Sequence, residues 1–332
     1  MTMATLEVQN LQTEFKSRDS TVLAVNDVSF SVQPGQIMGL VGESGSGKSM
    51  TAYSIMGLVD APGKVRGGQV LFKGQDLRGL SAEAMRQIRG NRIAMIFQDP
   101  MMTLNPVLRI DTQMMETISA HQQVSRESAR EMARAALVKV GIASPDERLL
   151  AYPHQFSGGM RQRVAIAIAL LNQPELIICD EPTTALDVTI QGQILYEMQK
   201  LCRESGTALI WITHDLSVVA GLADTVSVMY AGKIVESGTV SQVLEQALHP
   251  YTHGLIASSP SRNQHGQTLH QIPGATPSLL NLPSGCAFRN RCERASTACE
   301  QVPPLQQTDG HSVLCFHPMH STDSLRAGAA HV

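Results

Sequence analysis

The stretch that decides the fold of this chain is residues 37–49, which read IMGLVGESGSGKS. Residues 37–41 are almost entirely apolar, as expected of a strand in a sheet that is covered on both faces. The segment 42–49 follows at once and fits the pattern G-x-x-x-x-G-K-[ST]. Residues 50–59 then look helical. A buried strand, a glycine-rich turn and a helix in this order predict a phosphate-binding loop in an α/β domain.

The chemistry of this loop points to a nucleotide. Its glycines let successive backbone N–H groups curl around a phosphate, and the N-terminus of the next helix adds partial positive charge. Lys48 would reach the β- and γ-phosphates, and Ser49 would ligate Mg²⁺. The alternative is a flexible glycine turn, which the strand-helix context disfavours. The residues of this segment that we expect to bind ATP are Gly42, Ser44, Gly45, Ser46, Gly47, Lys48, Ser49 and Met50.

Residues 176–181 form a second informative segment, an apolar strand that ends in two carboxylates. Asp180 fits the metal-coordinating acid of P-loop NTPases. Glu181 could polarise the attacking water as a general base. Taken alone, the pair is also compatible with a solvated acidic turn after a core strand.

Residues 156–160 read FSGGM, and the RQR that follows opens a helix with a glycine-rich N-terminus. On physical grounds this is a second anion site. A protein that works alone has no evident need for two helix N-termini that can each bind a phosphate. The arrangement is explained if each of the two forms half of a binding site whose other half comes from another subunit.

Together these motifs resemble the nucleotide-binding subunits of ABC transporters over about residues 6–250. The matching features are the phosphate loop 42–49, Gln98 after the strand 93–97, the signature 156–160, Asp180-Glu181, Ala185-Leu186-Asp187, and His214 after a strand. The signature departs from the family in having Phe156 and Met160 where Leu and Gln are commoner. Its Ser-Gly-Gly centre is intact.

The resemblance implies a role for each matching residue. Gln98 would contact Mg²⁺ and the attacking water and sense the membrane partner, although a single Gln after a strand is often only a polar cap. His214 would contact the γ-phosphate, although a lone histidine at a strand end is more often structural. Asp187 would communicate across the dimer, and Phe15 would be the platform under adenine or else a core residue. Ser157, Gly158, Gly159 and Met160 would bind the γ-phosphate held by the other subunit.

The rest of the sequence predicts the surrounding architecture. Residues 6–32 look like an antiparallel edge, and the alternation of strands and helices after residue 174 predicts a parallel sheet. Residues 111–141 have helical periodicity, with a cap at Ser125 and a stop at Gly141. A hairpin is expected around Ala231-Gly232. The fold class is α/β, a P-loop NTPase core with a parallel sheet, an antiparallel β subdomain, an inserted helical signature subdomain and a small irregular C-terminal extension.

The expected domains are a nucleotide-binding domain at residues 1–255, with its helical subdomain at about 99–172, and the extension at 256–332. The formal net charge of −3 and 17% charged residues give no basic excess for nucleic acid. No apolar run approaches the roughly 20 residues that span a bilayer, and the chain begins without a secretory signal pattern. We therefore expect a cytosolic protein, and the resemblance implies a peripheral location at the cytoplasmic face of the inner membrane.

The extension narrows the family. Its segments HPYT at 249–252, IPG at 272–274 and LPSGCAFRNRC at 282–292 are similar to the extension on ATP-binding subunits of bacterial di- and oligopeptide importers, and resemble most the dipeptide-type subunit. This implies a second, different ATPase subunit, two membrane permeases and an extracytoplasmic peptide-binding protein as partners. No nucleic-acid partner is expected.

Four cysteines gather in the extension, namely Cys286, Cys292, Cys299 and Cys315. Four thiolates suffice for tetrahedral Zn²⁺ or for an iron–sulfur cluster, and plain thiols or disulfides remain an alternative. The spacing lacks paired C-x₂-C knuckles, and the family resemblance implies a [4Fe–4S] cluster. The expected cofactors are thus ATP, Mg²⁺ and that cluster.

The predicted activity is ATP hydrolysis that energises uptake of di- or oligopeptides, through closure of a dimer of ATPase subunits coupled to the permeases. One alternative is an importer ATPase for another small solute, such as nickel complexes. Another is a soluble ABC ATPase that acts on nucleic acid, and a third is a module that uses nucleotide only as a switch.

Overall fold

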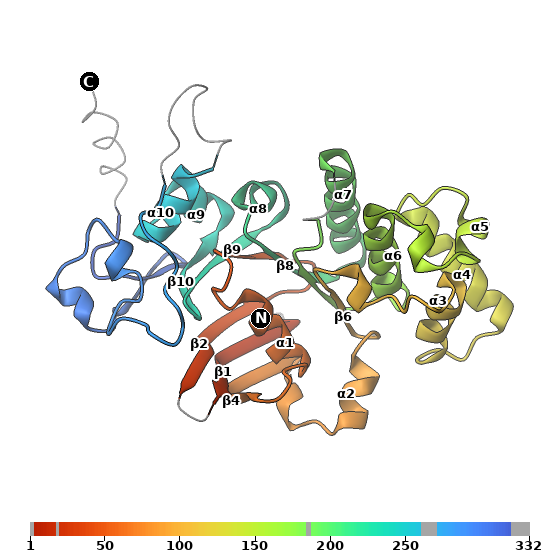
Figure 1. Cartoon of the computed structure of the whole chain (residues 1–332), viewed down its shortest axis with the longest axis horizontal. Helices are drawn as coiled ribbons and strands as arrows, with labels where there is room; N and C mark the ends of the chain where they lie inside the picture. The colour runs from red at the N-terminus through yellow and green to blue at the C-terminus, as the bar shows by residue number, and fades with distance from the viewer. Residues whose placement is uncertain (1–2, 18–19, 184–186, 260–270, 320–332) are drawn as a thin grey trace. The chain divides into compact units, whose positions relative to one another are not determined.

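The structure is a computed structural model that describes residues 3–17, 20–183, 187–259 and 271–319 (Figure 1). The chain divides into two compact units. The first comprises Met1–Leu6, Ser31–Ile37 and Leu71–Trp211, and the second comprises Glu7–Phe30, Met38–Val70 and Ile212–Val332. In the described residues no helix combines the length and apolar character that crossing a membrane requires.

In the first unit, a set of buried strands lies in the order β8, β7, β6, of which the last two residues of β8 belong to the second unit. These are β6 (Ile93–Ile96), β7 (Leu176–Asp180) and β8 (Ala208–Thr213). β6 and β7 run parallel, with Ile93 opposite Leu176. Every residue of β7 and β8 is buried, which is why these strands appear in the sequence as continuous apolar runs. The parallel arrangement confirms the prediction from strand-helix alternation.

The helices of the first unit include the insert that carries the signature segment (Figure 1). They are α2 (Ala82–Ile88), α3 (Ile110–Ser119), α4 (Arg126–Lys139), α5 (Pro145–Leu149), α6 (Gly158–Leu170) and α7 (Val188–Ser205). The helical region expected at 111–141 is thus two helices, α3 and α4. Ser125 begins the second one, because its hydroxyl accepts a hydrogen bond of 3.1 Å from the Ser128 N–H. Gly141 follows the end of α4 with φ 69°.

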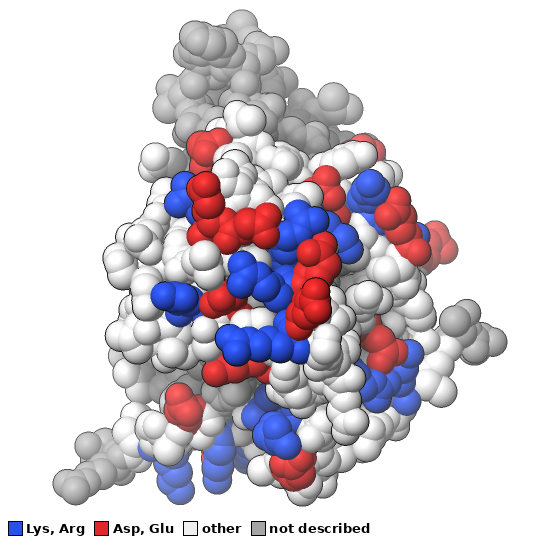
Figure 2. All heavy atoms as spheres, turned by 90° about the vertical axis from the view of Figure 1, so that its right-hand side faces the viewer, with Lys and Arg blue, Asp and Glu red and all other residues white. Residues whose placement is uncertain are grey.

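The face that carries α3 to α6 displays basic and acidic side chains intermixed, as Figure 2 shows. On α4, for example, Arg134 pairs with Glu131 at 3.0 Å. A continuous basic surface, which phosphate backbones of nucleic acid require, is not seen on the described residues of this face. The near balance of acidic and basic residues in the sequence is reflected in the mixed charges on this face.

The second unit contains two sets of strands. One has the order β2, β1, β4. Its members are β1 (Leu6–Lys16), β2 (Thr21–Val32) and β4 (Gly63–Phe72). The end of β4 belongs to the first unit and pairs there with β5 (Gln75–Asp76). The other has the order β11, β12, β10, β9, β3. Its members are β3 (Ile37–Val41), β9 (Thr225–Tyr230), β10 (Lys233–Thr239), β11 (Leu305–Thr308) and β12 (His311–Leu314). The helices here are α1 (Lys48–Met56), α8 (Leu216–Leu222), α9 (Val240–Glu245) and α10 (Pro250–Ala257).

The hairpin expected around residues 231 and 232 is present. β9 and β10 pair antiparallel, and Ala231 and Gly232 between them have φ values of 46° and 82°. β9 in turn runs parallel to β3, with Met38 opposite Thr225. The strand that leads into the phosphate loop is therefore flanked by β9.

The extension is more regular than the sequence suggested, because it adds strands to this sheet. β12 pairs antiparallel with β10, with Glu236 opposite Val313, and β11 pairs with β12. All four residues of β11 are exposed, so it has no apolar alternation by which the sequence could reveal it. Phe288 is buried in one core with Tyr230 and Tyr251, at ring centroid distances of 5.3 and 5.4 Å. The boundary near residue 255 stays a prediction.

Candidate functional site

The phosphate loop has a backbone that only glycine can adopt at two positions. Gly42 and Gly47 have φ values of 153° and 104°. A Cβ at Gly42 would lie 2.2 Å from the Met229 carbonyl oxygen, and one at Gly47 would lie 2.4 Å from the Ala24 carbonyl oxygen. Ser44 and Gly45 are exposed, while Ser49 and Met50 lie on the first turn of α1. The loop therefore joins β3 to α1 in the way that the sequence predicts.

Two polar side chains of the loop are suited to phosphate. Lys48 is buried, and its ammonium group donates to the carbonyl oxygens of Gly42 at 2.8 Å and Glu43 at 3.1 Å. The hydroxyl of Ser46 is buried and has no hydrogen-bond partner among the described residues. A buried hydroxyl without a partner is costly, and a phosphate oxygen is an acceptor that would satisfy it. The loop thus fits the phosphates of a nucleotide.

Phe15 is half-buried at the end of β1. Its ring lies close to Gly63, where an added Cβ would approach the ring to 2.6 Å. One part of the ring is therefore covered by the segment after α1. Its role as an adenine platform stays a prediction.

The extension holds the phosphate loop at Glu43, which sequence reasoning missed. The guanidinium of Arg291 donates to both carboxylate oxygens of Glu43, at 2.6 and 3.0 Å, and the Thr276 hydroxyl donates at 2.5 Å. The Glu43 N–H donates to the Tyr251 hydroxyl at 2.8 Å. Burial of the Glu43 carboxylate opposes ionisation, but the hydrogen bonds and charge of Arg291 outweigh it and leave the pKa of Glu43 below its ordinary value. No local pattern reveals a pair separated by 248 residues.

The first unit brings two of the predicted catalytic residues together. Asp180 is the last residue of β7 and is 1% exposed. Glu181 follows with φ 45°, a left-handed conformation that non-glycine residues seldom adopt. The Gln98 side-chain amide donates to the Glu181 carboxylate at 3.4 Å. The end of β7 therefore presents a carboxylate and an amide side by side.

The signature segment begins α6, with Ser157 as its cap. The Ser157 hydroxyl accepts a hydrogen bond of 3.3 Å from the Met160 N–H. Ser157 and Gly158 are exposed, Gly159 is partly exposed, and an added Cβ at Gly158 would meet open space. Phe156, one of the two departures from the family pattern, is buried beside the guanidinium of Arg148, which lies 5.7 Å from the ring centroid. Phe156 therefore anchors the segment, and the Ser-Gly-Gly centre faces solvent.

Asp187 and His214 lie at the starts of two other helices. Asp187 caps α7, where its carboxylate accepts a hydrogen bond of 3.0 Å from the Ile190 N–H. Ala185 and Leu186 of the same motif lie outside the described residues. His214 is exposed between β8 and α8, beside Asp215, which caps α8. Both residues are accessible, as contacts with nucleotide or another subunit require.

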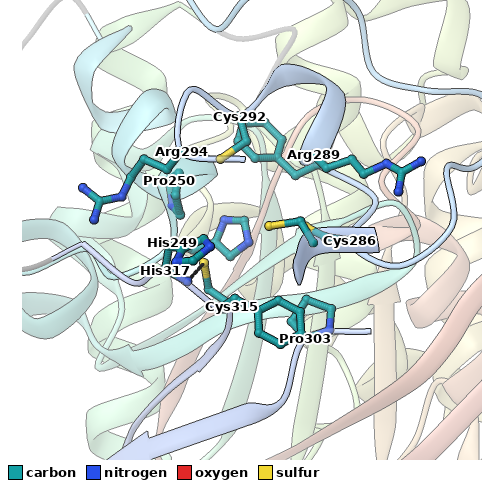
Figure 3. Close-up of a pocket in the computed structure, with 12 residues that line it drawn as sticks. His249, Pro250, Cys286, Arg289, Cys292, Arg294, Pro303, Cys315 and His317 are labelled. Atoms are coloured by element: carbon teal, nitrogen blue, oxygen red, sulfur yellow. Dashed lines mark hydrogen bonds between the residues drawn. The ribbon is translucent and has the colours of Figure 1, made fainter. Parts of the chain in front are cut away.

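The four cysteines of the extension line one cavity together with His249 and His317. In Figure 3 the labelled thiols of Cys286, Cys292 and Cys315 approach this space from different segments of the extension. Burial raises the pKa of these three thiols, for Cys315 to about 11. In the described parts of the chain, no group of three or more His, Cys, Asp or Glu is arranged to hold a metal ion.

His249 is the most buried polar residue beside the thiols. Its Nδ1 accepts a hydrogen bond of 3.0 Å from the Tyr251 N–H, and burial lowers its pKa to about 4. The imidazole is therefore neutral near pH 7, with its proton on Nε2. It adds no positive charge to the cavity.

Comparison with known proteins places this geometry in a family. A family model described as ABC transporter matches residues 25–184, and one described as oligopeptide/dipeptide transporter, C-terminal region, matches residues 235–299. Among solved structures, a dimeric post-hydrolysis state of an ATP-binding cassette bound to ADP and Pi has a TM-score of 0.65 and 27% identity, and covers 71% of this chain and 98% of that chain.

Curated relatives match almost the whole chain. The oligopeptide transport ATP-binding protein OppD of Escherichia coli is 47% identical over 317 residues, which cover 95% of this chain and 94% of that protein. The dipeptide transport ATP-binding protein DppD of Bacillus subtilis is 49% identical over 314 residues, with 94% of each covered. With the phosphate loop, the signature segment and the four-cysteine extension in place, this chain belongs to the family of ATP-binding subunits of ABC-type oligopeptide and dipeptide transporters.

Proposed function

We propose that this chain hydrolyses ATP to energise the import of di- or oligopeptides. The observation that carries the proposal is the phosphate loop, in which the buried Ser46 hydroxyl lacks a partner in the described chain and Lys48 lies over the loop carbonyls. ATP with Mg²⁺ is the ligand that this loop fits and that the ABC ATPase family uses. Relatives named for peptide transport, matched over almost the whole chain, support the peptide cargo.

The predicted site residues with reactive or charged side chains have proposed roles. In the loop, Lys48 would bind the β- and γ-phosphates and Ser49 would ligate Mg²⁺, with further Mg²⁺ contacts from Asp180 and Gln98. Glu181 would accept the proton of the attacking water, and the Gln98 amide beside it supports that assignment. His214 would contact the γ-phosphate, and Phe15 would stack on adenine.

The signature segment supports action in a pair. Because Ser157 and Gly158 face solvent at the N-terminus of a 13-residue helix, they would bind the γ-phosphate held by another ATPase subunit. Asp187 would communicate across that dimer. The proposed partners are a second, different ATPase subunit, two membrane permeases and, through them, an extracytoplasmic peptide-binding protein. This chain would then lie at the cytoplasmic face of the inner membrane as a peripheral subunit.

The test uses the full complex, purified after co-expression with the permease and second ATPase subunits and reconstituted in vesicles. We expect ATP-dependent uptake of labelled di- or tripeptides, and peptide bound to the associated binding protein in mass spectrometry. Uptake of nickel complexes instead of peptides would overturn the cargo assignment. ATP binding without hydrolysis in the complete complex would overturn the catalytic one.

We further propose that Cys286, Cys292, Cys299 and Cys315 hold a [4Fe–4S] cluster. Their donor chemistry fits, because four cysteines around one cavity supply the four thiolates that such a cluster needs. Among the described residues no group of three or more His, Cys, Asp or Glu is arranged to hold a metal ion, so the proposal rests on the four-cysteine donor set and on the family resemblance. When bound, the cluster would cross-link the segments of the extension that carry these cysteines, and Arg289 and Arg294, which line the same cavity, would supply positive charge near its thiolates.

A further inference from the structure

The phosphate loop carries an acidic side chain, Glu43, at one of the positions that the loop pattern leaves open. Glu43 directly follows Gly42, and its carboxylate is near enough to the phosphate-binding Lys48 for the charge of that ammonium group to help lower the pKa of Glu43. A carboxylate this close to the phosphates would repel them if it were unpaired. Something must therefore compensate the charge of Glu43.

Arg291 of the extension supplies the compensation. Its two terminal nitrogens reach the two oxygens of Glu43 at 2.6 and 3.0 Å, in the two-pronged geometry that fixes orientation as well as charge. The Arg291 side chain is 7% exposed and that of Glu43 27% exposed, so solvent screens this ion pair little.

The guanidinium is itself held in place. Its Nε donates to the Pro273 carbonyl oxygen at 2.9 Å, and its central carbon lies 5.9 and 5.8 Å from the ring centroids of Tyr230 and Phe288. Arg291 lies on the short turn between Cys286 and Cys292, and its N–H donates to the Phe288 carbonyl oxygen at 2.9 Å. The fold of the four-cysteine segment therefore determines where this charge stands.

We propose that Arg291 is a positioning residue of the nucleotide site, which neutralises and orients Glu43 so that the phosphate loop accepts ATP. The extension is then a working part of the ATP site as well as a neighbour of it. Without Arg291, the loop keeps a negative charge next to the phosphates and loses its anchor. Because the unpaired carboxylate repels the phosphates, affinity for ATP falls even in a variant that stays folded.

The proposal rests on the proposed function, because it presupposes that this chain binds ATP. ATP binding by the wild-type full chain is therefore measured first. The measurement is the dissociation constant for ATP by calorimetry on the full chain, with unfolding temperature recorded for every variant. For Arg291→Met we expect affinity to fall about 10- to 30-fold, as repulsion between an unpaired carboxylate and phosphate at partial burial predicts. In the complex, KM for ATP rises while kcat is largely retained.

The decisive variant is Arg291→Met combined with Glu43→Gln, which removes both charges. Charge compensation predicts that the pair recovers affinity to within about threefold of wild type, since no unpaired carboxylate remains. Arg289→Met is the matched control, because Arg289 lies on the same turn and its guanidinium donates to the Ser284 hydroxyl at 3.3 Å, in an exposed contact. It should bind ATP like wild type.

Two results would overturn the proposal. One is a double variant as weak as Arg291→Met alone, which would mean that Arg291 acts only by holding the extension folded. The other is unchanged affinity in a folded Arg291→Met. Failure of the wild-type chain to bind ATP would instead refute the proposed function. That outcome is distinct from the two results above, because both of them require a wild-type chain that binds ATP.

Discussion

The side-chain amide of Gln98 lies 3.4 Å from the carboxylate of Glu181, at the point where β7 ends and the chain turns with Glu181 in a left-handed conformation. Strained backbone of this kind persists where its surroundings hold it, and it often marks functional sites. The amide orients a carboxylate that stands directly after the buried Asp180. The geometry suits a base that must face a water molecule next to a metal.

Replacing this carboxylate by an amide tests the assignment. We expect Glu181→Gln to bind ATP with wild-type affinity and to lower kcat by about 10²-fold or more, since general base catalysis contributes on that scale. Steady-state ATPase assays on the complex and ATP binding by the isolated chain measure the two effects. Normal turnover would show that another group takes the proton.

The matched control for that variant is Glu175→Gln. Glu175 directly precedes the same strand, is partly exposed, and pairs with Arg92 at 2.7 Å. Its loss should leave kcat unchanged, because a solvent-accessible ion pair contributes only about 0 to 1 kcal/mol to stability and takes no part in the chemistry.

A negative charge in the signature segment should separate binding from hydrolysis. Gly158→Asp meets open space in the folded chain, and an acidic residue at a helix N-terminus is compatible with the helix dipole. We expect normal stability and normal ATP binding by the isolated chain, but loss of most ATPase activity in the complex, where the introduced carboxylate would repel the phosphate held by the partner. Thermal unfolding, calorimetry and ATPase assays measure these three quantities.

Gly192→Asp on α7 is its control, because Gly192 is also exposed with open space around an added Cβ. Equal losses in both variants would indicate a nonspecific effect of charge on assembly. A Gly158→Asp variant with full activity in the complex would contradict the role of the signature in trans.

The cysteines of the extension should determine iron content. Wild-type protein purified without oxygen is expected to hold about four iron and four acid-labile sulfide ions per chain, the composition of a [4Fe–4S] cluster. Cys292→Ala should lose most of both, while Cys202→Ala, which removes a buried thiol of α7 outside the extension, should keep them. Zinc in place of iron, or neither metal, would refute the cluster.

Stability of the extension depends on a buried carboxylate. Glu236 is fully buried and accepts hydrogen bonds from the Leu248 N–H at 2.7 Å, the His249 N–H at 2.8 Å and the His311 imidazole at 2.8 Å. Glu236→Ala leaves these donors without an acceptor and should lower the free energy of unfolding by about 3 to 5 kcal/mol.

Denaturant unfolding monitors that loss, with Glu236→Gln as the conservative comparison. The amide oxygen keeps one acceptor, so we expect this variant to lose less than the alanine variant. Equal stability of wild type and Glu236→Ala would show that the donors find other partners.

Local patterns predicted much of the fold because the physics involved is local. β7 and β8 are buried on both faces and therefore appear as unbroken apolar runs. The Ser125 cap of α4 and the hairpin at Ala231-Gly232 follow from a few adjacent residues. Within the helical region expected at 111–141, the cap at Ser125 and the stop at Gly141 bound α4, and α3 precedes the cap.

By itself, the sequence determined the phosphate loop, the two carboxylates at the end of β7 and the signature segment, since each needs only neighbouring residues in a fixed order. Tertiary structure alone decided that Arg291 reaches Glu43, and that β12 extends the sheet beside β10. Those contacts join residues far apart in the chain, and no periodicity or motif encodes a pairing that only the folded backbone brings within hydrogen-bonding distance.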